Sequence, residues 1–104
     1  MVLENEIMTI IANAGDSRNC SLEAIECAKL GNFEEANKLL KKAEDALLVA
    51  HRDHTVILTN SAKKTSEVTV TFILVHAANH LSIAEVSLDM AKNFVDILKE
   101  MKKC

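Results

Sequence analysis

The sequence predicts an all-α protein, a three-helix antiparallel up-down bundle. The chain has no proline and only two glycines, so the usual signals for hairpins and loop-rich folds are missing. Apolar residues recur at alternating spacings of three and four over long stretches, which is the period of a helix packed on one side. Two short polar interruptions separate three such stretches. We expect a single domain over 1–104, with helices over about residues 4–30, 33–60 and 67–102.

The first expected helix carries apolar residues at spacings compatible with one buried stripe. Gly15 and Asp16 near its middle are weak helix formers, which leaves room for a bend. A clear signal ends this helix: Gly31 suits a left-handed C-cap, and Asn32 with Glu35 forms the pattern of a capping box for the next helix. The apolar positions are Ile7, Ile10, Ile11, Ala14, Leu22, Ile25 and Ala28.

The second expected helix shows the seam of an antiparallel helical bundle, with positions alternating by four and three. A polar stretch at residues 59–67 follows it, and Ser66 is the expected N-cap of the third helix. The seam consists of Ala36, Leu40, Ala43, Leu47, Ala50, His54 and Ile57.

The third expected helix is apolar over more than half of its circumference. Its β-branched start, residues 68–75, alone suggests a strand, but a three-four repeat lasting about seven turns favours a helix. One stripe consists of Leu74, Ala77, Leu81, Ala84, Leu88, Ala91, Val95 and Leu98. A second consists of Phe72, Val75, Asn79, Ile83, Val86, Met90, Phe94, Ile97 and Met101. Because a surface helix of a monomer needs one apolar stripe of about 100°, the second predicts a further neighbour, such as another subunit.

Charge and composition exclude several classes of function. Twelve basic residues are scattered among fifteen acidic ones and the net charge is −3, so we expect no nucleic-acid partner. The longest weakly polar run, 68–78, is shorter than the roughly 20 apolar residues that span a bilayer, so we expect no membrane insertion. No basic segment precedes the first apolar residues, which predicts no secretory signal and a cytoplasmic location. Cys20, Cys27 and Cys104 are odd in number and lack zinc-ligand spacing, so we expect reduced thiols.

Four histidines are the candidates for chemistry: His51 and His54 in the second helix, and His76 and His80 in the third. His76 and His80 lie one turn apart between the two apolar stripes, so we expect them in a groove between packed helices. Spacing leaves three interpretations open. The pair is partly buried and satisfied by neighbours, or it binds a metal such as zinc, although no HExxH glutamate separates the residues. In the third interpretation, a neutral imidazole with one exposed nitrogen accepts a phosphoryl group.

Three blocks of sequence carry a resemblance to a known family. Residues 73–81 read ILVHAANHL and resemble the active-site segment of the enzyme IIA component of the lactose and cellobiose (chitobiose) branch of the bacterial sugar phosphotransferase system. That segment typically reads His, a small residue, Gln, Asp, His, Leu. Residues 13–18, reading NAGDSR, resemble the family's first-helix segment, and Ala50, His51 and Thr55 match its second-helix Ala-His-x-x-Gln-Thr segment. The junction at residues 31–33 is similar too.

The resemblance implies an assembly, an activity and partners. Three-helix subunits would form a homotrimeric nine-helix bundle. The protein would be a phosphotransferase component that accepts a phosphoryl group from the histidine-containing phosphocarrier protein and passes it to a cysteine of the cognate enzyme IIB, for uptake of a β-linked disaccharide such as lactose or cellobiose. His76 would be the phosphorylated residue, on its outer ring nitrogen, and His80 would orient it or support the phosphoryl group.

Several residues bear on how closely the chain follows this pattern. Ala78 stands where the family usually has glutamine, so a side-chain donor near the phosphoryl site is missing and slower transfer is expected. Asn79 replaces an aspartate that lies at the three-fold axis and is associated with a divalent cation. Three asparagines there need no counter-charge, so we expect a weak axial cation or none, and no permanently bound cofactor or metal. His54 replaces a glutamine and is expected to form buried hydrogen bonds, whereas His51 matches the family and is expected to support the site or to be structural.

Two other functions stay open at this point. A transfer-impaired trimeric interaction module would keep the bundle while Ala78 and Asn79 mark altered or lost transfer. A His-based metal-binding bundle would need both His76 and His80 as ligands.

Overall fold

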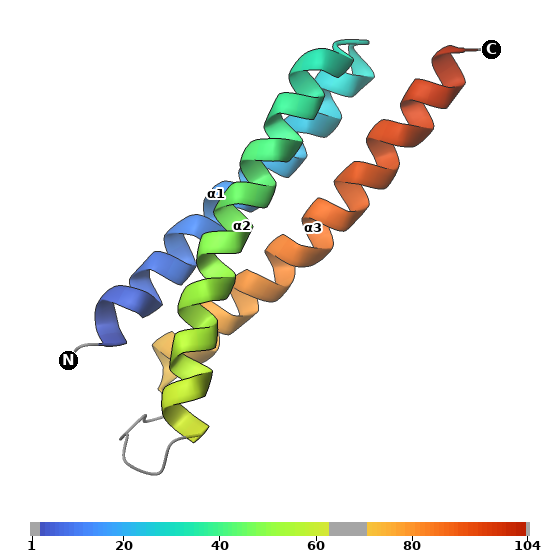
Figure 1. Cartoon of the computed structure of the whole chain (residues 1–104). Coiled ribbons are helices and arrows are strands. Elements are labelled where there is room, and N and C mark those ends of the chain that lie inside the picture. Colours follow the sequence, from blue (N-terminus) through green and yellow to red (C-terminus); the bar gives the residue numbers. More distant parts are fainter. Residues whose placement is uncertain (1–2, 63–70, 104) are drawn as a thin grey trace.

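The computed structural model describes residues 3–62 and 71–103, which form three helices. Helix α1 spans Leu3–Lys29, α2 spans Phe33–Ala62 and α3 spans Phe72–Lys102. Figure 1 shows that α1 and α2 form an antiparallel hairpin and that α3 runs antiparallel to α2 along an elongated rod of 59 × 19 × 18 Å. The predicted three-helix all-α bundle is therefore confirmed.

The structure refines the predicted helices at two places, the middle of α1 and the start of α3. Helix α1 continues through Gly15 and Asp16 as one unbroken element. Helix α3 begins at Phe72 rather than at residue 67, because Thr71 is extended (φ −116°, ψ 166°) and its Oγ1 accepts the N–H of Leu74 at 3.2 Å. The expected cap Ser66 lies outside the described residues. The part of the strand-like run that is described, from Phe72 onward, is helical, because the long three-four repeat outweighs β-branched propensity.

The turn between α1 and α2 has the conformation that the sequence predicts. Gly31 adopts a positive φ of 83°, in the left-handed region. Its N–H bonds the carbonyl of Ala28 at 3.0 Å, and the N–H of Asn32 bonds the carbonyl of Cys27 at 2.9 Å, which together form a Schellman motif. The side chain of Asn32 then caps α2 by accepting the N–H of Glu35 at 3.3 Å. The predicted Gly31 C-cap and Asn32 N-cap are confirmed, but the capping box is only half formed, because the N–H of Asn32 bonds Cys27 and not the side chain of Glu35.

Replacing Gly31 by alanine is expected to lower the free energy of unfolding by about 1–2 kcal/mol, because an L-residue is strained at this φ. An added Cβ would also lie 2.8 Å from the Lys102 Nζ at the end of α3. The matched variant is Gly15→Ala, where a Cβ meets nothing within 4 Å and where alanine favours the helix by about 0.5–1 kcal/mol. Urea unfolding of both variants measures the difference. Equal effects would contradict the assigned turn.

Small residues bring the three helices together, and most of the large apolar side chains lie outside the core. The buried positions of α3 all belong to its first predicted stripe. The buried positions of α2 belong to its predicted seam with one exception, because Leu39 is buried while the predicted Leu40 is half-buried. Alanine dominates the core, which includes Ala14, Ala24, Ala28, Ala36, Ala43, Ala50, Ala77, Ala84 and Ala91. Alanine allows close helix packing but contributes little apolar area, so the single chain buries a thin core.

The buried stripe of α1 differs from the predicted one in its middle. Leu22 was expected inside but is 43% exposed, whereas Ser17 and Ser21 are fully buried. The stripe keeps its three-four spacing through both serines to Ala24, so helical register decides burial there and not side-chain hydrophobicity. Ser17 Oγ donates a 2.8 Å hydrogen bond to the carbonyl of Ala43 in α2, while Ser21 Oγ has no partner among the described residues.

The two buried serines predict opposite effects of the same substitution. Ser17→Ala is expected to lower the free energy of unfolding by about 1 kcal/mol, because it removes a buried hydrogen bond between α1 and α2. Ser21→Ala is expected to leave stability unchanged or to raise it by up to about 1 kcal/mol, because it removes a buried hydroxyl without a partner. Chemical denaturation of the two variants makes the comparison, and a larger loss in Ser21→Ala would contradict the assigned contacts.

Candidate functional site

Helix α3 places His76 and His80 in direct contact near its N-terminal end. Their Nε2 atoms lie 3.0 Å apart, so the Nε2–H of one ring donates to the Nε2 of the other, with the roles set by the tautomers. The ring centroids are 4.4 Å apart and the rings are nearly perpendicular, at 86°. The contact follows from helical geometry, because residues four apart lie one above the other. The two histidines are therefore joined by a hydrogen bond between their outer ring nitrogens.

The histidine pair lies at the surface of the single chain. His76 is exposed and His80 is half-buried. His76 lines a surface pocket together with Phe72, Ile73, Val75 and Asn79, all from α3. The described residues therefore do not form the expected groove between packed helices, because the residues that line the pocket around His76 all come from α3. The pocket leaves the imidazole of His76 accessible to a large molecule.

The other histidines are not part of this pair. His51 of α2 contacts Glu85 of α3, with Nε2 and Oε1 2.7 Å apart, on the polar side of α3. His54 is half-buried in the α2 seam, but it makes no hydrogen bond with any described residue, so the expected bonded role is not observed within that part of the chain. Sequence spacing gave no signal for the contact between His51 and Glu85, because it depends on how two distant helices pack.

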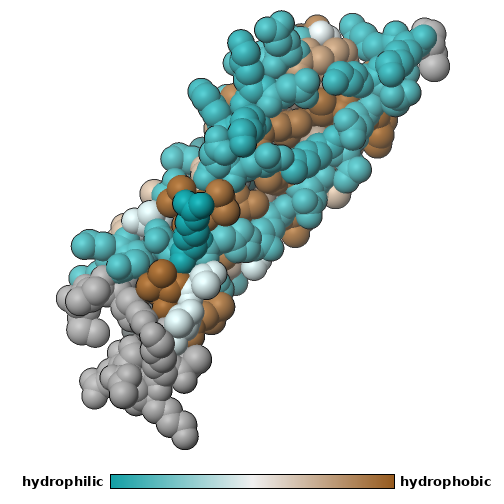
Figure 2. Space-filling view, in the orientation of Figure 1, coloured by the Kyte–Doolittle hydropathy of each residue, from teal (hydrophilic) through white to brown (hydrophobic). Residues whose placement is uncertain are grey.

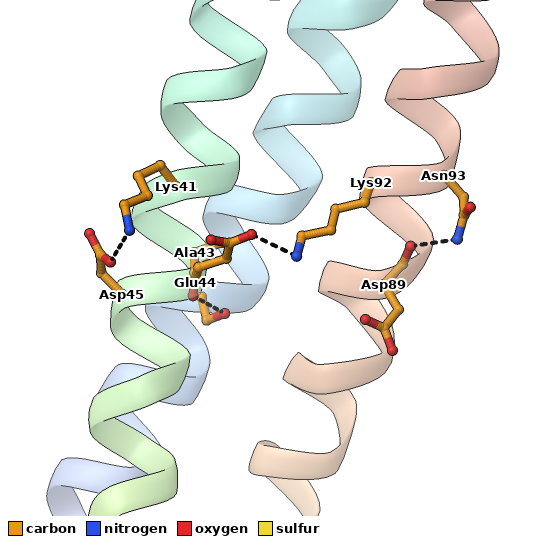
Figure 3. A network of polar contacts seen from close by, with 8 residues as sticks. Lys41, Ala43, Glu44, Asp45, Asp89, Lys92 and Asn93 are labelled. Carbon is orange, nitrogen blue, oxygen red and sulfur yellow. Dashed lines mark hydrogen bonds and ion pairs between the residues drawn. The ribbon is translucent and has the colours of Figure 1, made fainter.

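A second polar contact joins α2 to α3. Lys92 of α3 and Glu44 of α2 point toward each other across the gap between the helices, with Nζ and Oε1 2.6 Å apart (Figure 3). With the His51–Glu85 pair, this ion pair occupies the face of α3 that also carries exposed Asp89 and Asp96. The polar face of α3 is thus directed toward α2, and the second apolar stripe is directed elsewhere.

Position 78 lies on a different face of α3 from the histidine pair. Ala78 is half-buried, and a separation of two residues from either histidine corresponds to a rotation of about 200° around the helix. A side chain at this position points away from the rings of His76 and His80 of the same chain. A side chain at position 78 would therefore not be a donor beside the histidines of the same subunit. This could have been foreseen from the sequence, because the rotation of about 100° per residue already places position 78 opposite His76 and His80.

The second apolar stripe of α3 is exposed, as the sequence predicts. Phe72 is 97% exposed and Val86 is 62% exposed, and the other large apolar members are also exposed: Val75, Ile83, Met90, Phe94, Ile97 and Met101. Asn79 lies within this stripe and is exposed too. Figure 2 shows brown hydrophobic atoms along the α3 edge of a mostly hydrophilic face. A surface of this kind marks an interaction site.

Helix α1 extends this apolar surface beside the start of α3. Ile7 and Met8 line a pocket together with Ile73 of α3, and Met8 is exposed. The apolar surface thus covers parts of two helices next to the histidine pair.

Charge near the pair favours an anion. Helix α3 has no acidic residue in its first turn, and Thr71 caps its N-terminus. No acidic residue of that first turn offsets the positive end of the helix dipole, and His76 lies in the second turn. A phosphoryl group on the ring would lie beside a favourable partial charge.

The remaining reactive groups among the described residues give no sign of a second catalytic site. Cys20 and Cys27 are free and half-buried; burial raises the pKa of the Cys20 thiol and the Glu23 carboxylate adds to this effect, so the thiol stays protonated. No three His, Cys, Asp or Glu side chains within 3–62 and 71–103 gather closely enough to hold a metal ion. None of the helices in those ranges is long and apolar enough to cross a bilayer.

Comparisons with known proteins agree on one family. Residues 5–99 match the family described as "PTS system, Lactose/Cellobiose specific IIA subunit". The chain is 36% identical over 101 residues to the lichenan-specific phosphotransferase enzyme IIA component of Bacillus subtilis (strain 168), covering 95% of this chain and 89% of that protein.

Solved structures show the same similarity. The cellobiose-specific enzyme IIA of Bacillus anthracis superposes with a TM-score of 0.93 at 28% identity, covering 99% of this chain and 94% of the other. The IIA(chitobiose) chain in a solution structure of its HPr complex, from Escherichia coli, gives a TM-score of 0.73 at 25% identity, with 96% of each chain covered.

Proposed function

The chain belongs to the lactose/cellobiose-specific IIA family of the phosphotransferase system, whose members are phosphoryl carriers, and we propose that His76 is the residue that carries the phosphoryl group. One observation supports this choice most directly. His76 is an exposed imidazole in a pocket, and its Nε2 contacts a second imidazole that is able to hold a proton for it. His51 and His54 lack this arrangement.

In the proposed reaction one P–N bond breaks as another forms. The lone pair on Nε2 of His76 attacks the phosphorus of a phosphohistidine on the donor, the donor P–N bond breaks, and a new P–N bond forms at His76. His76 keeps its proton on Nδ1 throughout. Because Nε2 of His76 must leave the bond with His80, the Nε2–H of His80 becomes available to donate to a phosphoryl oxygen. In the second transfer a cysteine thiolate of enzyme IIB attacks the same phosphorus and leaves His76 neutral again.

The proposed donor is HPr, the histidine-containing phosphocarrier protein. Its support is the similarity to a IIA chain solved in complex with HPr. The apolar pocket wall around His76, with Phe72 and Val75 exposed beside the ring, suits a transient partner that buries a modest area.

Labelling with phosphoenolpyruvate tests the proposal. The chain is incubated with phosphoenolpyruvate, enzyme I and HPr, and intact-mass spectrometry is expected to show the gain of one phosphoryl group, which acid removes and base does not. Peptide mapping is expected to place the group on His76. A related IIA protein serves as the positive control; if it is labelled while this chain is not, the proposed function is wrong.

We further propose that the chain forms a homotrimer, a nine-helix bundle in which the second apolar stripes of three α3 helices meet. The stripe, from Phe72 to Met101, repeats at spacings of three and four, which suits a central coiled coil. Asn79 is the polar residue within it. Three asparagine side chains around an axis form a hydrogen-bonded layer that sets the register and needs no cation, so an axial divalent cation would bind weakly or not at all.

Asn79→Asp is expected to make the assembly depend on a divalent cation. Three carboxylates near one axis repel each other unless a counter-charge neutralises them. The thermal midpoint of the variant is expected to rise on addition of Mg²⁺ and to fall on addition of chelator, while the unchanged protein responds to neither. A midpoint that is insensitive to Mg²⁺ in both proteins would contradict the axial position of residue 79.

The transport role is proposed in outline. The carrier acts in the cytoplasm, delivers the phosphoryl group to its cognate enzyme IIB, and serves uptake of a β-linked disaccharide such as lactose or cellobiose, in line with the description of its family. Deletion of the gene is expected to abolish growth on one such sugar. The wild-type gene restores growth and the His76→Gln gene does not; normal growth of the deletion strain on all β-linked disaccharides would contradict the role.

The alternative of a transfer-impaired interaction module is less well supported. It relied in part on Ala78 as a missing donor, but a side chain at position 78 points away from His76 of the same chain. The labelling experiment separates the two functions, because the module predicts trimer formation without phosphorylation.

A further inference from the structure

We propose that His76 and His80 together chelate a divalent transition-metal ion through their Nε2 atoms, and that the bound ion blocks phosphoryl transfer. The block rests on the proposed function; the chelation does not. The ion is an exchangeable inhibitor here and not a permanent cofactor.

The distance between the two nitrogens matches a chelate. Imidazole nitrogens bind such ions at about 2.0–2.1 Å, so two nitrogens 3.0 Å apart subtend an angle of about 91–97° at a common metal ion. That angle is close to the cis angle of square-planar and octahedral coordination, which copper(II) and nickel(II) adopt. Tetrahedral zinc, with an angle of about 109°, would need a slightly longer separation. Both ligands lie on one helix, so binding fixes only the torsions of two side chains.

Metal binding displaces the proton that lies in the hydrogen bond between the two Nε2 atoms. In the free pair, one ring carries its proton on Nε2 and donates it to the other ring. Metal binding needs both Nε2 lone pairs, so that proton moves to Nδ1 of the same ring and the rings rotate toward the ion. No oxidation or bond cleavage is involved.

The surroundings predict reversible binding. His76 is exposed in its pocket, so an ion has access from solvent. Within the described parts of the chain no third His, Cys, Asp or Glu completes a set of ligands, so water would occupy the remaining positions. Two protein ligands give weaker binding than the three or four of a permanent site.

Binding of metal and binding of a phosphoryl group exclude each other at one atom. The Nε2 of His76 has one lone pair, which either bonds the metal or bonds phosphorus. The phosphorylated chain is therefore expected to lose the chelate, and the metal-bound chain is expected to accept phosphoryl groups more slowly.

Calorimetric titration with Ni²⁺ tests the chelate on the unphosphorylated full chain. We expect saturable binding of one ion per chain, with loss of that binding in both His76→Gln and His80→Gln. The matched control is His51→Gln, which removes a histidine that contacts Glu85 on the other face and is expected to bind Ni²⁺ as the wild type does. Circular dichroism verifies that each variant keeps its helices. Binding that persists in both site variants, or no binding by the wild type, would overturn the proposal.

A second measurement tests the exclusion. Chain phosphorylated beforehand is expected to bind no Ni²⁺, and equal binding by the phosphorylated and free chains would refute the shared atom. Labelling without Ni²⁺ binding would overturn the chelate while leaving the proposed function intact. Conversely, Ni²⁺ binding that needs both histidines, in a chain that is never labelled, would support the chelate and overturn the proposed function.

Discussion

His76→Gln is expected to abolish phosphoryl acceptance from HPr, lowering the labelling rate at least about 1,000-fold, because removal of a nucleophile eliminates the covalent step. Glutamine has a similar size and favours helices, and His76 is exposed, so the fold is expected to stay intact. The measurement is the initial rate of label transfer from phosphorylated HPr, with circular dichroism and thermal unfolding as checks on folding.

His80→Gln is the matched variant, since it lies one turn away and removes the hydrogen-bond partner of His76. It is expected to slow labelling by about 100-fold or less, because a lost donor for the phosphoryl group costs less than a lost nucleophile. Label on His80 in the His76→Gln protein, or equal rates for His76→Gln and the wild type, would contradict the assignment of His76 as the acceptor.

Val86→Glu is expected to convert the proposed trimer to monomers at micromolar concentration. Val86 is 62% exposed in the single chain and lies in the middle of the second apolar stripe of α3. In the proposed assembly three glutamates would be buried together near the axis, and each would lose its hydration without a partner. Sedimentation equilibrium measures the mass of the wild type and of the variant.

The control for this experiment is Val56→Glu, the same substitution on α2. Val56 is 44% exposed and lies outside the α3 stripe, so the mass of the assembly is expected to stay unchanged. A monomeric wild type would contradict the trimer outright. Dissociation by Val56→Glu but not by Val86→Glu would place the subunit interface on α2 and contradict the stripe.

Features that depend on one helix at a time were predictable from the sequence. The first stripe of α3 matches the buried residues, and Gly31 and Asn32 form the predicted caps, because each depends on local geometry. The contact between His76 and His80 follows from their separation of four residues. In each case the relevant spacing lies within a few turns of one helix.

Features that depend on packing between helices were not predictable from residue spacing within one helix. Leu22 was assigned to the core by its hydrophobicity, but the register of α1 places Ser17 and Ser21 there. The partner of His51 is Glu85, more than thirty residues away along the chain, and no sequence pattern connects them. The expected start of α3 also failed, because several residues near it are able to cap a helix and the structure uses Thr71.

The alanine-rich core has a consequence for how this protein behaves on dilution. Contacts inside one chain are made largely by alanine side chains, whereas the bulky side chains of the second α3 stripe would be buried only in the proposed trimer. In that assembly, association and folding would draw on the same free energy. By mass action, the melting temperature of the proposed trimer rises with protein concentration. A cell that makes too few copies would therefore hold a partly unfolded carrier, and supply of subunits would set its working stability.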